Sequence, residues 1–304
     1  MTNYYMKYSV INIAGKGSFG VVYKIKDLHT NKIHALKKIK ISSVLHHKQK
    51  ELLLNELRIM KYNYSPYLLK LEEMFIERGL NVCIVTPFIS YGDLNTIILA
   101  RKLYFKEQLI WIYFLQMCLG VKYLHEHNII HRDLKTSNIY LGEGDKIVIG
   151  DFGISKIFNN NQSMSRTFIG TPYYMSPEML GQQEYDKKAD IWSLGCVLYE
   201  LLTFKMPFNG YNLFDLKRKV RGLNFSKRLY EIRCSKELLK ILKHMLQFAS
   251  KERPTIIEIL DDEEVYQHMY MIPYVGRTEP IYDFDKNFRE IPNIYIYEIN
   301  EYIK

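Results

Sequence analysis

The sequence predicts an α+β protein with two lobes, because strand-like and helix-like patterns occupy different parts of the chain. Apolar and polar residues alternate over 21–26 and 33–40, which is the period of half-buried strands. Residues 48–62 instead carry apolar side chains at helical spacing, and short apolar runs return over 67–88. Helical patterns dominate beyond residue 94, over 105–125, 187–204, 212–221 and 235–248. We therefore expect an N-lobe with an antiparallel β-sheet plus one helix, followed by a mainly α-helical C-lobe.

The length of 304 residues fits one large domain or two modest ones. We expect residues 8–262 to form a single bilobal domain. Within it, the N-lobe spans 8–88, a hinge spans 87–91 and the C-lobe spans 92–262. An N-terminal extension over 1–7 precedes this domain. A tail over 263–304 follows it, rich in Tyr and Ile without a heptad repeat, and the sequence assigns the tail no role.

The composition is that of an ordinary globular protein, with 47% hydrophobic and 25% charged residues. The net charge of +9 comes without a dense Lys/Arg run, so we expect no nucleic-acid partner. The four cysteines form no CxxC pair, which argues against zinc sites and disulfides and favours a reducing compartment. The N-terminus lacks an apolar signal segment, and the apolar stretch 109–121 is too short to span a bilayer. We expect an intracellular protein without membrane insertion.

A glycine-rich segment, Gly15-Lys16-Gly17-Ser18-Phe19-Gly20, lies between two predicted strands. Glycines let the backbone approach phosphate oxygens and point its N–H groups at them. The motif is weak alone, and its dinucleotide-binding version requires a helix directly after the loop, whereas a strand follows here. We therefore predict that Gly15, Gly17, Ser18, Phe19 and Gly20 bind the phosphates of a nucleotide.

Lys37 shares one face of a predicted strand with apolar residues, so it needs a counter-charge there. Nucleotide α- and β-phosphates would supply that charge, and so would Glu56 on the predicted helix. The alternative is a surface lysine whose apolar stem alone is covered. The role of Glu56 depends entirely on Lys37, because by itself Glu56 would be a solvated helix carboxylate.

The strongest signal is His131-Arg132-Asp133-Leu134-Lys135-Thr136-Ser137-Asn138, followed by Asp151-Phe152-Gly153. Phosphoryl transfer needs one carboxylate to orient the attacking hydroxyl, and further oxygen ligands to hold Mg²⁺ against the phosphates. We assign Asp133 as the catalytic base and Asn138 and Asp151 as magnesium ligands. Lys135 would neutralise the charge that develops on the transferred group. Each residue alone could be structural, but this order behind a glycine loop and Lys37 favours catalysis.

These motifs resemble those of the eukaryotic protein kinase superfamily, over residues 8 to about 262. The stretches HRDLKTSNIYL, IGDFGISK, TFIGTPYYMSPE and KKADIWSLGCVLYELLT resemble the NimA-related (Nek) serine/threonine kinase family in particular. The resemblance implies a bilobal protein kinase fold with ATP bound beneath the N-lobe sheet. It also implies ATP and Mg²⁺ as cofactors, with Mn²⁺ as a substitute. Lys135, and Thr171 in the substrate loop, are typical of serine/threonine rather than tyrosine kinases.

The resemblance implies further residues around the adenine. It places Val22 and Ala35 above the ring and Tyr140 below it. It places Thr86 at the gatekeeper position, and Pro87 to Ile89 in the hinge that binds adenine through backbone atoms.

The resemblance also implies residues that support and regulate the site. Asp190 would brace the catalytic loop, while Glu178 and Arg253 would form a buried ion pair. Arg132 beside the catalytic base implies activation by phosphorylation. Thr167 is the matching acceptor, and Arg132 and Lys156 are the expected partners of its phosphate.

Three features depart from the family pattern. Tyr140 stands where the family usually has Phe. Leu71 stands where many members carry a tyrosine that blocks the site, and we expect Leu71 to line up with Met60, His131 and Phe152 instead. The coiled-coil tail common in the family is absent, which puts coiled-coil dimerisation in doubt, and we expect a monomer.

The leading hypothesis is an active serine/threonine kinase with protein substrates, activated by an upstream kinase or by autophosphorylation. The alternative is a catalytically silent pseudokinase scaffold, but such proteins usually lack the equivalents of Lys37, Asp133 or Asp151. A small-molecule phosphotransferase would lack the substrate loop at 170–178 and Arg253. The resemblance implies cell-cycle, centrosome or cilium-related signalling, in the cytoplasm, in the nucleus or on the cytoskeleton.

Overall fold

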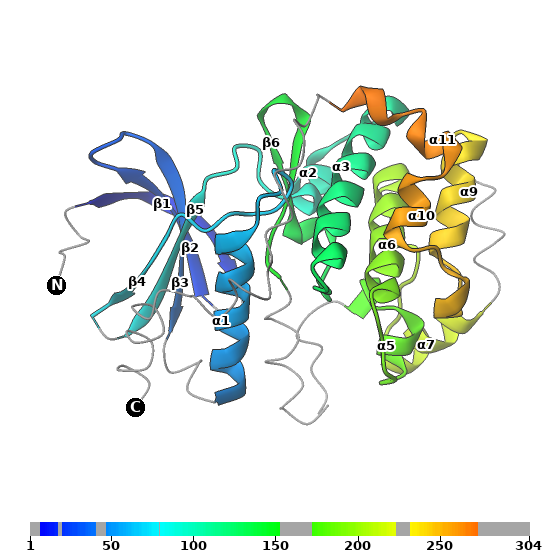
Figure 1. The fold of residues 1–304 in the computed structure, drawn as a ribbon, viewed down its shortest axis with the longest axis horizontal. Coiled ribbons are helices and arrows are strands. Elements are labelled where there is room, and N and C mark those ends of the chain that lie inside the picture. The colour runs from blue at the N-terminus through cyan, green and yellow to red at the C-terminus, as the bar shows by residue number, and fades with distance from the viewer. Residues whose placement is uncertain are drawn as a thin grey trace.

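The computed structural model describes residues 7–17, 20–40, 47–78, 80–152, 172–222 and 232–272. These residues form two lobes, a five-stranded sheet with one helix beside it and a larger helical lobe (Figure 1). The α+β class and the bilobal arrangement predicted from the sequence are confirmed.

The N-lobe sheet has the strand order β1-β2-β3-β5-β4, and each neighbouring pair is antiparallel. The strands are β1 (Tyr8–Gly17), β2 (Gly20–Asp27), β3 (Ile33–Lys40), β4 (Glu73–Glu77) and β5 (Asn81–Pro87). One face of the sheet buries a small apolar cluster of its own, formed by Ile25, Leu36, Phe75, Cys83 and Val85. The opposite face packs with helix α1 (His47–Tyr62) into the main hydrophobic core.

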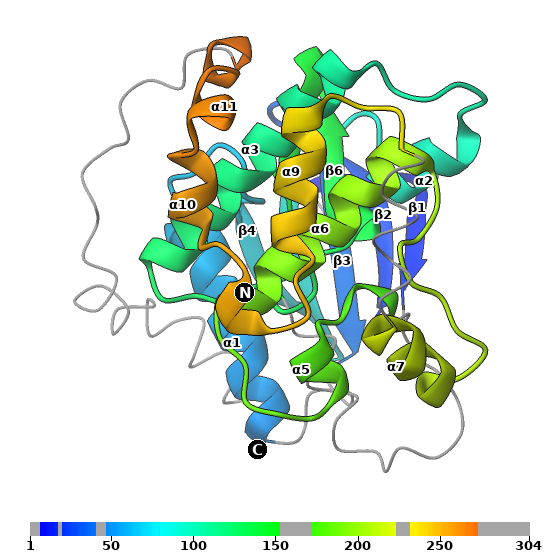
Figure 2. The ribbon, with the colours of Figure 1, turned by 90° about the vertical axis from the view of Figure 1, so that its right-hand side faces the viewer.

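The C-lobe is built around two buried helices, α3 (Glu107–Glu126) and α6 (Lys188–Thr203). Helix α6 is buried continuously from Ala189 to Leu201, which explains its nearly uninterrupted apolar sequence. Six shorter helices are described around them: α2 (Leu94–Ala100), α5 (Pro177–Leu180), α7 (Leu213–Arg221), α9 (Lys236–Met245), α10 (Ile256–Leu260) and α11 (Glu263–Tyr266). Helices α9 and α10 lie over α6 and α3, with the N-lobe strands behind them (Figure 2). Short 3₁₀ turns complete this lobe: η3 (Thr136–Asn138), η4 (Glu143–Asp145), η5 (Pro172–Tyr174), η6 (Ser250–Glu252) and η7 (Met269–Met271).

The helical segments that the sequence predicts by range begin within two residues of α1, α3, α6, α7 and α9, and local capping explains part of the difference. The sequence patterns predict no ranges for α2, α5, α10 and α11. Asn212 and Ser235, each the first residue of a predicted helix, are N-caps whose side chains accept hydrogen bonds from backbone N–H groups one turn ahead. Helix α9 ends at Met245, three residues before the predicted end at 248, because Leu246 leaves the helical conformation.

A two-stranded hairpin, β6 (Ile139–Gly142) and β7 (Lys146–Ile149), lies between the two lobes. Isolated bridges join Leu68 to Ile149 on one side and Asp93 to Tyr140 on the other. The hairpin follows residues 131–138 and precedes Asp151, so it fixes both predicted catalytic segments relative to the core.

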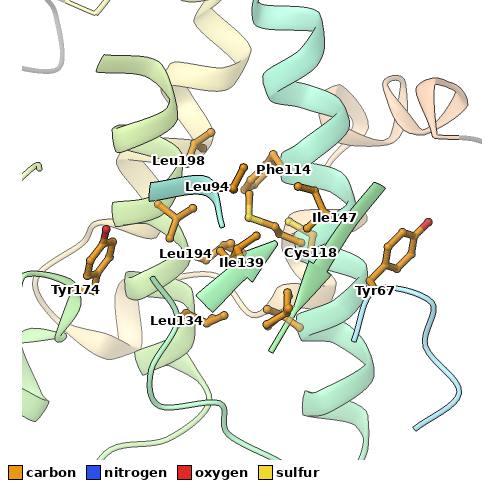
Figure 3. Packing of buried hydrophobic residues seen from close by; sticks show 14 of the residues in the cluster. Tyr67, Leu94, Phe114, Cys118, Leu134, Ile139, Ile147, Tyr174, Leu194 and Leu198 are labelled. Atoms are coloured by element: carbon orange, nitrogen blue, oxygen red, sulfur yellow. The ribbon is translucent and has the colours of Figure 1, made fainter. Parts of the chain in front are cut away.

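The core under these segments is apolar and fully packed. Figure 3 shows Leu134 and Ile139 among side chains from α2, α3 and α6, including Leu94, Phe114, Cys118, Leu194 and Leu198. Such close packing restricts the backbone above it, because interiors are as dense as organic crystals.

The first part of the predicted tail packs on the C-lobe. Val265 in α11 is fully buried, and the ring of His268 stacks on Trp111 of α3 at 4.0 Å between centroids. Residues 273–304 lie outside the described residues. No helix in the described part of the chain is long and apolar enough to cross a membrane.

Candidate active site

The start of the segment 131–138 is held by a buried aspartate from α6. Asp190 accepts hydrogen bonds from the backbone N–H groups of His131 and Arg132, at 2.8 and 2.9 Å. His125 of α3 contacts the same carboxylate at 2.9 Å. Arg132 has a positive φ of 67°, a conformation that costs on the order of 1–3 kcal/mol and persists only where the surroundings enforce it. Asp190 supplies this constraint on the catalytic loop.

Asp133 is buried and faces two polar neighbours from its own loop. The Lys135 ammonium donates to its Oδ2 at 2.8 Å. The Asn138 amide donates to the same Oδ2 at 2.9 Å and to the Asp133 carbonyl at 2.8 Å. The loop therefore gathers a carboxylate, an ammonium and an amide around one point, as the spacing of the motif predicts.

Asp151 lies at the end of β7 and carries a donor on each carboxylate oxygen. The Lys37 ammonium from β3 donates to Oδ1 at 2.5 Å, and the Tyr140 hydroxyl from β6 donates to Oδ2 at 3.2 Å. Asp151 also has a positive φ, of 54°. The ion pair brings together an N-lobe residue and a C-lobe residue that are 114 positions apart.

Glu56 lies near this pair without joining it directly. Lys37 pairs with Asp151. The charge of Glu56 raises the pKa of Lys37, but the described residues show no ion pair between Glu56 and Lys37. Glu56 is 4% exposed and accepts a hydrogen bond from the backbone N–H of Phe152. Its Oε2 atom is buried with no hydrogen-bond partner among the described residues.

Burial and charge shift the protonation of these groups in different directions. Burial alone would lower the pKa of Lys37, but the carboxylates of Asp151 and Glu56 raise it above its ordinary value. Burial would raise the pKa of Asp151, but the Lys37 ammonium holds it below its ordinary value. Burial raises the pKa of Glu56 to about 8, although Lys37 opposes the shift. The shifts in the pKa of Lys37 and Asp151 favour their charged forms, whereas burial favours the protonated form of Glu56.

The described glycines of the glycine-rich segment lie at the facing ends of β1 and β2, where Gly17 pairs with Gly20 and Gly15 pairs with Val22. A Cβ atom on Gly15 would meet nothing within 4 Å, so open space lies beside this position. A Cβ on Gly20 would instead lie 1.8 Å from the carbonyl oxygen of Lys38. Gly20 is therefore required by the close approach of β2 to β3. Ser18 and Phe19 lie outside the described residues.

Residues 8–270 match the protein kinase domain family. The chain belongs to the protein kinase family. It is 37% identical over 256 residues to the human serine/threonine-protein kinase Nek5 and 33% identical over 264 residues to human Nek2. It is 36% identical over 294 residues to the probable serine/threonine-protein kinase nek3 of Dictyostelium discoideum. The resemblance to the Nek kinases is confirmed.

The kinase chain is shorter than these relatives. The three alignments cover 84%, 84% and 94% of this chain, but 36%, 59% and 25% of the relatives. The similarity therefore concerns the kinase domain, and the additional segments of the relatives have no counterpart in the aligned region.

The donor set of this kinase domain fits a divalent cation that keeps part of its water shell. Asn138 uses its amide nitrogen toward Asp133, which leaves its Oδ1 as a hard oxygen ligand. No group of three or more His, Cys, Asp and Glu side chains in the described residues could hold a metal alone. Mg²⁺ suits such a site, because it is commonly bound by one or two protein oxygens together with phosphates and water.

The residues that the family resemblance places around adenine lie mainly on β2, β3 and β5. Ala35 pairs with Lys24 and with Thr86 in the sheet register, and Val22 pairs with Lys37. Thr86 is buried at the end of β5, and its hydroxyl lies 3.4 Å from the carbonyl of Pro87. The carbonyl of Ile89 accepts a hydrogen bond from Gly92 N–H, so the hinge closes in a turn.

The four side chains that were expected to line up behind the site, those of Met60, Leu71, His131 and Phe152, are all buried. The rings of His131 and Phe152 lie 5.4 Å apart, and Met60 and Leu71 belong with Phe152 to the main core. The backbone N–H of Leu71 donates to the carbonyl of Met60 at 2.9 Å. Burial lowers the pKa of His131, so its ring is neutral and suited to this apolar contact.

The Glu178 and Arg253 side chains form a bidentate ion pair in the C-lobe, with both N–O distances at 2.7 Å. Arg253 is 1% exposed and also donates to the carbonyls of Gln247, Lys188 and Phe248. Its guanidinium lies 5.0 Å from the centre of the Trp192 ring.

The regulatory residues are mostly beyond what the structure describes. Lys156, Thr167 and Thr171 lie outside the described residues. Arg132 is described, and its guanidinium lies 5.8 Å from the centre of the Tyr185 ring.

Besides the direct pairing of Lys37 with Asp151, two polar contacts of the site are not predicted by the sequence. One is the hydrogen bond from the Tyr140 hydroxyl to Asp151. The other is a buried chain in which the Tyr174 hydroxyl contacts Thr136 at 2.8 Å and Glu200 at 2.5 Å. The sequence carries a signal for the Tyr140–Asp151 contact, because position 140 is Tyr where the family usually has Phe. No sequence signal links Tyr174 to Glu200.

Proposed function

We propose that this protein is a serine/threonine protein kinase that transfers the γ-phosphoryl group of Mg-ATP to Ser and Thr hydroxyls of protein substrates. The observation that carries the proposal is the joint placement of Asp133, Lys135 and Asn138 in one loop with the Lys37–Asp151 pair beside it. Phosphoryl transfer needs these groups and little covalent chemistry from the protein.

Each group has a separate task in this mechanism. Asp133 orients the acceptor hydroxyl and accepts its proton, and its buried carboxylate is kept in place by Asn138. Lys135 donates toward the same point and offsets negative charge on the transferred group. Lys37 binds the α- and β-phosphates once they compete with Asp151 for its ammonium.

Asn138 and Asp151 would hold the Mg²⁺ ion, which would neutralise charge on the phosphates. Glu56, close to Lys37 and with one unpaired oxygen, is available to pair with the lysine when nucleotide phosphates displace it from Asp151. Lobe closure around the nucleotide would bring this helix carboxylate closer.

The proposal is tested by replacing Asp133 with Asn and Lys37 with Met in the purified chain. Both variants should retain the wild-type melting temperature and lose transfer of labelled phosphate to a generic protein substrate. The Lys240→Ala variant, whose surface ammonium pairs with Asp262 and Glu264 far from the site, is the matched control and should keep full activity. Wild-type turnover in either folded site variant would contradict the mechanism.

The pseudokinase scaffold is the second candidate, and the same assay separates the two. A scaffold would bind partners without any turnover in the wild-type chain. The presence of Lys37, Asp133 and Asp151, with their side chains converging, favours the active enzyme.

Regulation by phosphorylation of Thr167 belongs to the same proposal. A phosphate there would add nearly two negative charges, which Arg132 and Lys156 could pair through charge-assisted hydrogen bonds. An upstream kinase or autophosphorylation would supply the phosphate.

The cellular context is proposed from the family. We infer an intracellular monomer, in the cytoplasm, in the nucleus or on the cytoskeleton, which phosphorylates proteins in cell-cycle, centrosome or cilium-related signalling and binds no nucleic acid. Light scattering after size-exclusion chromatography would test the monomer, and phosphoproteomics after selective inhibition would identify the substrates.

A further inference from the structure

The tyrosine under the adenine site has two ends with different surroundings. Its ring occupies the floor position, where the family usually has Phe, and a Phe ring would cover the same area. Its hydroxyl extends to Oδ2 of Asp151 at 3.2 Å. A floor for adenine does not need that hydroxyl.

The backbone on both sides of Tyr140 is fixed. Tyr140 pairs with Val148 in the β6–β7 hairpin and bridges to Asp93 on its other edge. A side chain on such a backbone presents its hydroxyl at a defined point, with little conformational freedom to lose.

Gly150 gives the ring the room to reach Asp151. A Cβ atom at 150 would lie 3.1 Å from Cε2 of Tyr140 and 3.0 Å from Cδ2 of Leu69, closer than ordinary contacts. The backbone of Gly150 is itself fixed, because its N–H donates to the carbonyl of Asn138 at 2.9 Å and its carbonyl contacts His131 Nε2 at 3.2 Å. The ring, the glycine and the carboxylate therefore form one assembly.

Building on the proposed kinase function, we propose that the Tyr140 hydroxyl is a positioning group for Asp151, holding its carboxylate in the orientation that takes a divalent cation together with nucleotide. In the site without nucleotide, Lys37 holds Oδ1 and Tyr140 holds Oδ2. When nucleotide phosphates take the lysine, the Tyr140 hydroxyl stays on Oδ2 and still restricts the rotation of the carboxylate. Each oxygen has about two lone pairs, so one donor on each leaves a position for the metal.

The expected loss of metal affinity can be estimated from this hydrogen bond. Groups that hydrogen-bond to a metal ligand typically contribute about 10- to 100-fold to metal affinity. The 3.2 Å distance is longer than a usual O–H···O bond, although such bonds in unliganded sites commonly tighten on binding. We therefore expect the lower end, about tenfold, for loss of the hydroxyl.

The test compares Tyr140→Phe with wild type in calorimetric binding of a non-hydrolysable ATP analogue across Mg²⁺ concentrations. Without Mg²⁺ the analogue should bind both proteins within about twofold, because the ring is kept. Mg²⁺ should increase the affinity of both proteins for the analogue. The Mg²⁺ concentration at which half of this increase is reached should be about tenfold higher for Tyr140→Phe, which corresponds to about 1.4 kcal/mol of Mg²⁺ binding energy.

The matched control is Tyr113→Phe. It also removes a tyrosine hydroxyl that donates to an aspartate, Asp145 at 3.0 Å, but outside the site. It should bind the analogue like wild type at every Mg²⁺ concentration.

An unchanged Mg²⁺ dependence in Tyr140→Phe would overturn the positioning role. An equal loss of affinity with and without Mg²⁺ would also overturn it, because that result describes the pocket floor alone. A wild-type protein that binds no analogue at any Mg²⁺ concentration would overturn the proposed kinase function itself, and the two failures are thereby distinguished.

Discussion

Replacing Glu178 with Gln should destabilise the C-lobe by about 3 kcal/mol. The wild-type pair has two short charge-assisted hydrogen bonds and an arginine that is 1% exposed. Removing one partner of a buried pair typically costs about 3–5 kcal/mol, because the other charge remains buried. The lower end applies here, since Arg253 keeps three backbone carbonyl acceptors and the Gln amide oxygen can still accept one bond.

The assay is thermal unfolding of the purified chain. For a domain of this size, about 3 kcal/mol corresponds to a fall in melting temperature of about 6–12 °C. Glu264→Gln makes the same side-chain change in the exposed pair with Lys240, and it should change stability by less than about 1 kcal/mol. Equal melting temperatures for Glu178→Gln and Glu264→Gln would refute the reasoning.

The dependence of stability on pH provides a second test of the Glu178–Arg253 pair. Burial would raise the pKa of Glu178, but Arg253 holds it below the ordinary value of 4.5. The unfolded state therefore takes up the proton first as the pH falls. The stability difference between wild type and Glu178→Gln should be complete at neutral pH, and it should shrink below about pH 4.5 as the pH falls through the folded pKa.

Substitutions at three further positions test the site and its regulation. Thr167→Ala should lower activity at least tenfold relative to the phosphorylated chain, and equal rates would remove Thr167 as the activating site. Leu71→Ala should lower both activity and stability through lost packing with Met60 and Phe152, by about 2–5 kcal/mol of unfolding free energy, and Leu71→Tyr should lower basal activity. Clear activation by Leu71→Ala would contradict the packing argument. Thr86→Met should leave the KM for ATP nearly unchanged and weaken a bulky inhibitor of the space behind adenine at least tenfold, about 1.4 kcal/mol, whereas equal potency would show that Thr86 does not control that space.

The parts of the site that lie in continuous motifs could be predicted from the sequence. Asp133, Lys135 and Asn138 meet within one loop of eight residues, so their spacing alone brings them together. Helix positions were also predictable to within a few residues, because apolar periodicity and capping side chains are local properties.

Contacts between segments that are distant in the sequence were harder to predict. The sequence suggested phosphates or Glu56 as partners for Lys37, and in the structure Asp151 is the direct partner. Which carboxylate reaches the lysine depends on how the lobes and α1 are placed, and no local pattern encodes that placement. Gly20 is a similar case. The motif predicts that Gly20 binds phosphate, but in the structure glycine is required at position 20 because the carbonyl of Lys38 on the next strand lies too close for a side chain.

The ion pair between Lys37 and Asp151 also makes the relative position of the two lobes depend on electrostatic attraction. The lysine belongs to the sheet of one lobe and the aspartate follows the hairpin beside the other, with side chains 29% and 35% exposed. Moving the lobes apart in the absence of nucleotide must therefore separate two opposite charges that water and salt can reach. Dissolved ions weaken such an attraction over about 8–10 Å, so raising the ionic strength should shift the empty enzyme toward more open forms. In the proposed mechanism, the phosphates of a nucleotide would replace the aspartate as the anion for the lysine.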